Sequence, residues 1–201
     1  MTRHSGDTGR RHFLALVGGS LLLSACSSSG PVALYGLSAA ADPGAPGRRS
    51  SAQVLVTRPR ALKALDTEYI AVAEPGPIYS YFPNVAWADS LPSVVQSKIV
   101  ETLQNTNRLR GVGMPGDGLL IDYQLQTELR AFELRVGGSS RALVEIAAKL
   151  VNDRNGRTVA SRVFRVESSA GTTDPDRAVA ALNRSADQVF SQIAEWTLQS
   201  I

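Results

Sequence analysis

The chain contains very few of the side chains that enzymes most often use. It has one cysteine, Cys26, and two histidines, His4 and His12, all within the first 26 residues. For the rest of the chain this excludes a Ser-His-Asp or Cys-His catalytic site, a His-ligated zinc ion and a disulfide. Asp and Glu are scattered singly, without a pair at a spacing that indicates acid–base catalysis. The sequence therefore predicts a protein that is not an enzyme and that binds no metal ion and no cofactor.

No hydrophobic run is long enough to cross a bilayer, which takes about 20 apolar residues. The apolar run at residues 13–23 follows a basic segment and leads into the tetrapeptide Leu-Ser-Ala-Cys that ends at Cys26. This order resembles the leader and lipobox of bacterial lipoproteins. We therefore expect residues 1–25 to be a lipoprotein signal peptide and Cys26 to be the lipidation site, carrying acyl chains such as palmitate. The alternative is an ordinary signal peptide followed by a buried cysteine.

Two further features concern export and sorting. Residues 8–14 resemble the twin-arginine export motif through Arg10 and Arg11, although a leader for the general secretory route explains them equally well. Ser27, rather than an aspartate, follows Cys26. By resemblance to lipoprotein sorting in enterobacteria, this predicts a protein of the cell envelope that is lipid-anchored in the outer membrane and faces the periplasm.

Neither charge sign dominates, because 21 Lys and Arg stand against 18 Asp and Glu. No basic run exceeds two residues, and aromatic residues do not alternate with basic ones. A nucleic-acid surface needs clustered positive charge on one face. The sequence therefore predicts no nucleic-acid partner.

Composition divides the remaining chain into a tether and a domain. Residues 26–52 are rich in Ser, Gly, Ala and Pro, a composition typical of flexible linkers. We expect this stretch to be a lipidated flexible tether. Residues 53–201 are long enough to bury one hydrophobic core, and we expect them to form a single folded domain.

Hydrophobic periodicity indicates the secondary structure of that domain. A Glu-Pro-Gly-Pro segment predicts a turn between two short strands, and Gly-Gly and Asn-Gly dipeptides predict turns between three longer ones. The predicted order is β-β-β-α-β-β-β-α, which implies an α+β fold: a single domain with a largely antiparallel sheet packed by two helices. The expected strands are 53–57, 69–73, 78–82, 121–136, 142–150 and 158–167, and the expected helices begin near Ser90 and Asp174.

Local patterns predict three finer details. In the fourth predicted strand the apolar residues change from odd to even positions near Arg130 and Ala131, which implies a β-bulge. Asp174 and Pro175 suit the N-cap and the first residue of the last helix. Residues 111–116 match G-x-G-x-x-G, but the match neither follows a predicted strand nor opens a helix. We interpret it as a connecting loop.

The best candidates for a binding surface are aromatic. In the predicted strand 78–82, Tyr79 and Tyr81 share one face because side chains alternate along a strand. Trp87 lies between this strand and the first helix, where a tryptophan packs into the core or contacts a partner. We take Tyr79, Tyr81 and Trp87 as candidate partner-binding residues.

Together these features resemble the ABC-type transport auxiliary lipoproteins, the lipoprotein component of MCE-type (mammalian-cell-entry-domain) and paraquat-inducible-type transport systems. The resemblance rests on the lipobox at Cys26, on Tyr35 and Leu37, on the aromatic stretch 78–82 leading to Trp87, and on the helices and strands that follow.

This resemblance implies a membrane-anchored accessory, non-catalytic lipoprotein of an ABC/MCE-type system that moves phospholipid or another hydrophobic substrate across the envelope. Its partners would be an MCE-domain periplasmic protein and an ABC permease and ATPase, with the lipid on Cys26 holding it to the membrane. A homo-oligomer is left open. A different interpretation fits the same leader, tether and small domain: an outer-membrane lipoprotein that activates a cell-wall synthase or supports envelope assembly.

Overall fold

The computed structural model describes residue 2, residues 33–40 and residues 47–201. Apart from residue 2, the predicted signal peptide lies outside the described residues, and so does Cys26. The described residues from 33 onward belong to one folded unit. Its described elements are β1 (Ala33–Tyr35), β2 (Gln53–Val56), β3 (Arg60–Ala61), β4 (Tyr69–Glu74), β5 (Ile78–Trp87), α2 (Leu91–Asn105), β6 (Gly111–Gly113), β7 (Tyr123–Arg135), β8 (Arg141–Asn152), β9 (Thr158–Ser169) and α3 (Pro175–Gln199).

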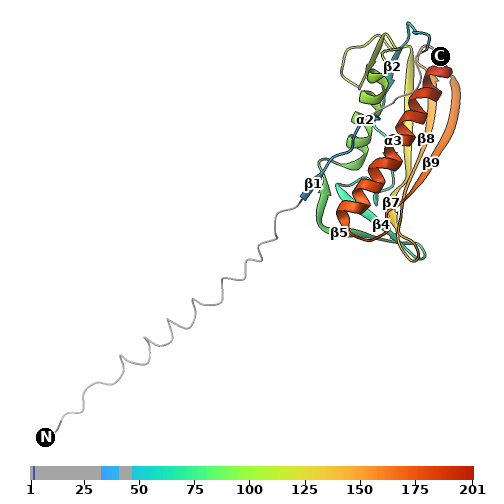
Figure 1. Ribbon diagram of the computed structural model, residues 1–201. Coiled ribbons are helices and arrows are strands. Elements are labelled where there is room, and N and C mark those ends of the chain that lie inside the picture. Colours follow the sequence, from blue (N-terminus) through green and yellow to red (C-terminus); the bar gives the residue numbers. More distant parts are fainter. Residues whose placement is uncertain (1, 3–32, 41–46) are drawn as a thin grey trace. The chain divides into compact units, whose positions relative to one another are not determined.

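The long strand β7 organises the sheet. One of its edges pairs antiparallel with β8, and β8 pairs antiparallel with β9. The other edge of β7 pairs in succession with β2, β3 and β4, all parallel to it (Figure 1). β5 pairs antiparallel with β4, while β1 lies parallel to β5 and β6 lies parallel to β2. The long ladders are therefore antiparallel, and the parallel pairings are short.

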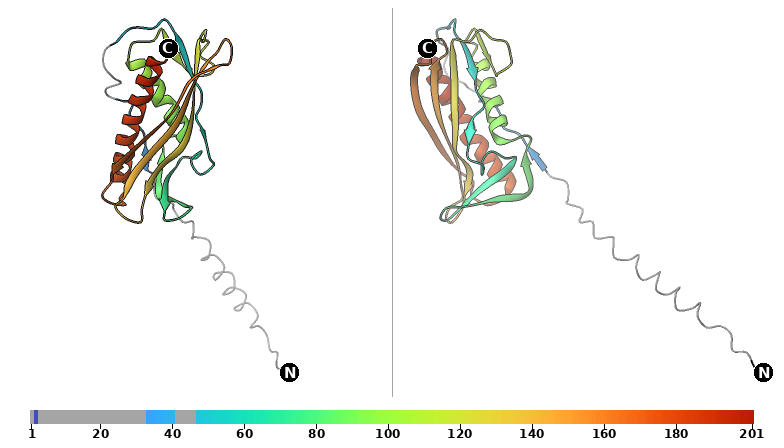
Figure 2. Two further views of the ribbon diagram at one scale, coloured as in Figure 1. Left: turned by 90° about the vertical axis from the view of Figure 1, so that its right-hand side faces the viewer. Right: turned by 180° about the vertical axis from the view of Figure 1, so that it is seen from behind.

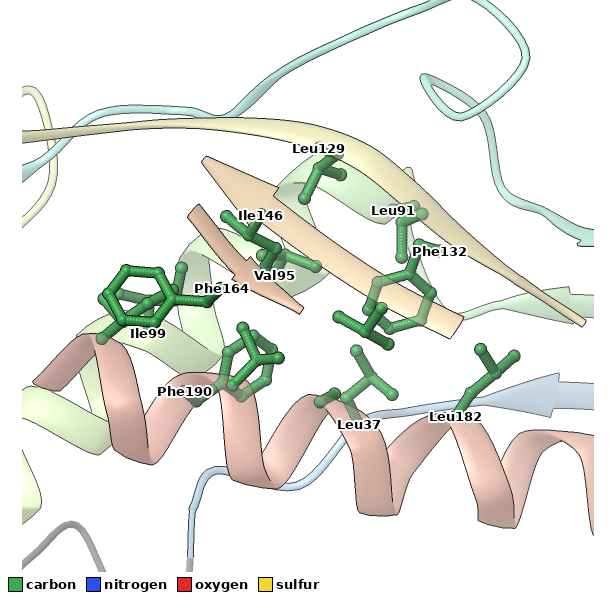
Figure 3. Packing of buried hydrophobic residues seen from close by; sticks show 14 of the residues in the cluster. Leu37, Leu91, Val95, Ile99, Leu129, Phe132, Ile146, Phe164, Leu182 and Phe190 are labelled. Atoms are coloured by element: carbon green, nitrogen blue, oxygen red, sulfur yellow. The ribbon is translucent and has the colours of Figure 1, made fainter. Parts of the chain in front are cut away.

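Both helices cover one face of this sheet (Figure 2). α3 packs against β7, β8 and β9, and α2 packs beside α3 and against β2 and β6. Apolar side chains from the helices and from alternate positions of the strands meet between the two layers (Figure 3). No helix in the described part of the chain is both long and apolar enough to span a bilayer. The buried stripe of α3 consists of Val179, Leu182, Ala186, Val189, Ile193 and Trp196.

The predicted α+β fold with two helices on a largely antiparallel sheet is confirmed. The predicted bulge is present, because the register between β7 and β8 shifts between Leu129 and Ala131. The last helix begins as predicted, with a proline as its first residue. The Asp174 side chain accepts a hydrogen bond from the backbone N–H of Arg177 at 3.1 Å and so caps the helix.

The strand β5 is longer than predicted and contains a wide bulge. The register shift between β4 and β5 leaves residues 82–85 opposite Ile70 alone. Within the bulge Asn84 has a φ of 57°, a left-handed conformation that asparagine tolerates better than most residues. Because the chain resumes pairing after the bulge, the strand continues to Trp87 instead of ending before Pro83.

Three short strands, β1, β3 and β6, were not predicted. Residues 111–113, interpreted from sequence as part of a connecting loop, form β6 beside β2. A Cβ atom on Gly113 would lie 2.5 Å from Oδ2 of Asp117. A larger residue here would have to displace the Asp117 side chain, so this glycine packs closely inside a strand and does not mark a loop.

The predicted domain boundary at residue 53 is too late, because residues 33–40 are part of the fold. β1 pairs with the end of β5, and Leu37 and Ala40 are buried in the core. The backbone N–H of Ser38 donates to Oδ1 of Asn183 at 2.8 Å, and that of Ala40 donates to Oγ1 of Thr102 at 3.1 Å. Composition typical of a linker therefore conceals a segment that both helices hold in place.

Candidate functional site

Three tyrosines lie on the face of the β4–β5 hairpin that points away from the helices. Tyr79 and Tyr81 stand opposite Ala73 and Ala71 of β4, and Tyr69 follows on the same face two residues before Ala71. They remain 53%, 40% and 39% exposed for Tyr69, Tyr79 and Tyr81, respectively. We call Tyr69, Tyr79 and Tyr81 the tyrosine surface.

Tyr79 is tied to a buried carboxylate. Its hydroxyl donates to Oε2 of Glu133 at 2.9 Å, while Nε of Arg135 donates to Oε1 of the same carboxylate at 3.1 Å. Glu133 is only 2% exposed, so these two donors compensate for burying its charge. Burial, and then the hydrogen bond to Glu133, raise the pKa of the Tyr79 hydroxyl above its ordinary value. Its phenol therefore remains a protonated donor at neutral pH.

Tyr81 and Tyr69 are not bonded to a buried charged group as Tyr79 is. Their ring centroids lie 5.6 Å apart with the planes tilted by 51°, a favourable aromatic pair. The Tyr81 hydroxyl donates to the carbonyl oxygen of Ala64 at 3.2 Å at the surface. The two rings and the β5 bulge at residues 82–85 line a hollow of about 360 Å³. These two rings and the hollow form the part of the tyrosine surface that is open to a partner.

Trp87 does not belong to this surface. It is 1% exposed and meets Phe132 edge to face, with ring centroids 5.7 Å apart. The β5 bulge has placed it in the core between the sheet and the helices, away from Tyr79 and Tyr81. Of the two roles considered from sequence, the structure shows core packing. A side chain buried this deeply offers a partner no contact area.

Sequence reasoning missed Tyr69, although a signal for it existed. Residues 69–73 and 78–82 were both expected as strands joined by a turn, and a tight hairpin fixes which residues stand opposite each other. Period-two alternation from Ala71 then places Tyr69 on the face of Tyr81. The contact with Glu133 could not be foreseen, because it depends on β7 pairing with the far edge of β4.

Within residues 33–40 and 47–201, no three His, Cys, Asp or Glu side chains gather closely enough to hold a metal ion. The tyrosine surface offers aromatic rings, hydroxyl groups and the ion pair between buried Glu133 and half-exposed Arg135. Its chemistry is suited to contact with another molecule through rigid amphipathic side chains.

The sequence pattern of one family, the ABC-type transport auxiliary lipoprotein component, matches residues 35–194. The chain belongs to this family. The match begins at Tyr35, within β1, so the family pattern includes the docked N-terminal segment as well as both helices and the sheet. The family is described as the auxiliary lipoprotein component of ABC-type transport.

Solved structures share the fold of this chain. The auxiliary lipoprotein resembles protein XCC0632 from Xanthomonas campestris with a TM-score of 0.76 and 26% identity, over 83% of this chain and 95% of that one. It shares its fold, at 8% identity and a TM-score of 0.55, with protein CT253 from Chlamydia trachomatis, over 75% of this chain and 98% of that one.

A curated relative from Bradyrhizobium diazoefficiens, the uncharacterized protein bll6063, is 28% identical over 151 residues. The match covers 75% of this chain but only 41% of that relative. The auxiliary lipoprotein thus spans about two fifths of the length of the curated relative it matches.

Proposed function

We propose that this auxiliary lipoprotein is a non-catalytic subunit of an MCE-type system that moves phospholipid or another hydrophobic substrate across the envelope. Acyl chains on Cys26 anchor it in the outer membrane, facing the periplasm. Its tyrosine surface binds the MCE-domain protein that works with the ABC permease and ATPase. The observation that carries the proposal is the exposed tyrosine surface on a chain of the auxiliary lipoprotein family.

The tyrosine surface has the composition of a protein-binding site. Tyrosine is enriched among the residues that dominate interface energies, because it covers a large area with few rotatable bonds. Tyr69 and Tyr81 already contact each other, so little side-chain entropy is lost when a partner covers them. The adjoining hollow at residues 82–85 can receive an apolar side chain of that partner.

Replacing Tyr69 and Tyr81 together by alanine should weaken binding to the MCE-domain protein about thirtyfold, since truncating central interface aromatics costs about 2 kcal/mol or more. Tyr79 is left intact because its loss would remove a hydrogen bond from the buried Glu133. Affinity is measured by titrating the purified partner, and folding is checked by thermal melting. Leu120→Ala with Val159→Ala serves as the matched control, since both side chains are exposed apolar residues outside the tyrosine surface.

A folded Tyr69→Ala/Tyr81→Ala variant that binds as tightly as the wild type would show that the interface lies elsewhere. An equal loss of affinity in the control pair would show that removal of any exposed apolar area weakens the contact.

The lipid anchor is tested separately. Cys26→Ser should abolish metabolic labelling with palmitate, because the acylated thiol is gone, and should release the protein from the membrane fraction. The wild-type protein should be labelled and should fractionate with outer-membrane markers. Absence of label in the wild type would remove Cys26 as the anchor, and recovery with inner-membrane markers would contradict the outer-membrane assignment.

A further inference from the structure

A hollow of about 440 Å³ on the outer face of the sheet shares no residue with the tyrosine surface. It lies over β7, β8 and β9, and β3 forms one side. Ala147, near its centre, pairs with Glu128 on one neighbouring strand and with Val163 on the other. Because a methyl group stands where long side chains surround it, the middle of this face is recessed.

Four basic residues line this hollow, one from each of four strands: Arg60 of β3, Arg130 at the β7 bulge, Lys149 of β8 and Arg162 of β9. The Arg162 guanidinium lies 5.2 Å from the centroid of the Phe164 ring. Glu128 is the one acidic side chain among the lining residues. Neither the Lys149 ammonium group nor the Arg130 guanidinium group forms an ion pair within the described part of the chain. The lining residues therefore carry four positive charges against one negative charge.

The nearby acids do not neutralise this excess. Nη2 of Arg60 lies 3.8 Å from Oε2 of Glu128, with 81% of the arginine side chain exposed, a separation and exposure at which an ion pair contributes little. Glu145, the acidic residue of β8, forms an ion pair with Nη1 of Arg165 at 2.8 Å. Glu145 is therefore already paired with Arg165, and it does not line the hollow.

We propose that this hollow binds a phosphoryl group, either of a phospholipid headgroup or of free phosphate. A guanidinium group offers a planar pair of donors that matches two phosphate oxygens, and an ammonium group adds a compact charge. Arg130 and Lys149 supply these two groups, and the Ser161 hydroxyl lines the same hollow as a further donor. Because basic residues of four strands line one hollow, a single compact anion fits it better than an extended polymer.

Binding is tested with the full-length lipidated protein in a non-ionic detergent, by calorimetric titration. The three probes are inorganic phosphate, dihexanoyl phosphatidic acid and dihexanoyl phosphatidylcholine. We expect phosphatidic acid to bind and the zwitterionic lipid to bind at least tenfold more weakly. Equal binding of inorganic phosphate and phosphatidic acid identifies the phosphoryl group itself as the ligand, whereas stronger binding of phosphatidic acid identifies a lipid headgroup. Absence of binding by both would overturn the proposal.

Two variants should move the affinity in opposite directions. Arg130→Gln with Lys149→Gln should weaken binding of the bound probe about tenfold or more, since charge-assisted hydrogen bonds are lost. Glu128→Gln should strengthen it severalfold, because it removes the one acid in the lining and frees Arg60. A Glu128→Gln variant with wild-type or weaker affinity would contradict the site even if the double variant fails to fold.

The matched control is Arg141→Gln with Arg177→Gln, which removes the same net charge from exposed positions that do not line the hollow. It should leave the affinity within twofold of the wild type. A loss equal to that of the Arg130→Gln/Lys149→Gln variant would show attraction by overall charge and would overturn the proposal. This experiment does not involve the MCE-domain partner, so its outcome is independent of the tyrosine-surface test.

Discussion

Replacing Trp87 by alanine is expected to lower the free energy of unfolding by about 3–5 kcal/mol, the usual cost of truncating a core tryptophan or phenylalanine. Trp87 is buried against the edge of Phe132 and joins the hairpin end of the sheet to the core under the helices. Its removal leaves a cavity that the paired strands β1, β4 and β5 cannot close without shifting. Urea unfolding followed by far-ultraviolet circular dichroism measures the change.

Trp87→Phe is the matched control for this prediction. The indole Nε1 of Trp87 has no hydrogen-bond partner among the described residues, so phenylalanine retains most of the ring and removes a buried polar group that is not satisfied. We expect a smaller loss than for alanine, because most of the buried ring volume remains and the cavity is correspondingly smaller. A Trp87→Ala variant that keeps wild-type stability but loses the MCE-domain partner would return Trp87 to the interface.

Leu37→Ala should lower the free energy of unfolding by about 2–3 kcal/mol, toward the lower end of the range for buried leucines. Leu37 is 5% exposed and lies among the core side chains between α3 and the sheet (Figure 3). The segment around it is short and is also held by β1, by the Tyr35 hydroxyl, which donates to Asp176, and by hydrogen bonds at Ser38 and Ala40. Once its anchor is truncated, the segment can detach at a smaller cost than a full cavity, which limits the loss.

Leu34→Ala provides the comparison within the same segment. Leu34 is 66% exposed, and a surface substitution of this kind changes stability by about 0.5 kcal/mol or less. Urea unfolding reports the two stabilities, and amide hydrogen exchange should show faster exchange at residues 33–40 in Leu37→Ala alone. Equal effects of the two substitutions would mean that burial of Leu37 does not hold the segment.

The sequence was most informative where a pattern extends over many residues. The α3 stripe repeats over about five turns, and the β7 alternation changes phase at Arg130, so each predicted both the element and its buried face. Asp174 predicted a helix start because a cap depends only on neighbours in the chain. These features are local, and local physics determines them.

The sequence was least informative where the structure depends on a distant strand. β1 has three residues and is extended because it pairs with Val85–Trp87. Its composition alone is typical of a linker. β6 contains two glycines and exists because β2 offers a free edge. The hollow at Ala147 is likewise invisible in the sequence, because Arg60, Arg130 and Lys149 come together only through the pairing of β3, β7 and β8.

The docking of residues 33–40 sets how far the domain can travel from an acylated Cys26. Ala33, the start of β1, lies seven positions after Cys26, and a fully extended chain of that length reaches about 25 Å. A tether running to residue 52 would have reached about 90 Å by the same measure. α3 has 25 residues and is therefore about 37 Å long, longer than that reach. With Cys26 acylated as proposed, the domain stays within a thin layer beside its membrane. A partner assembly has to extend into that layer to bind it.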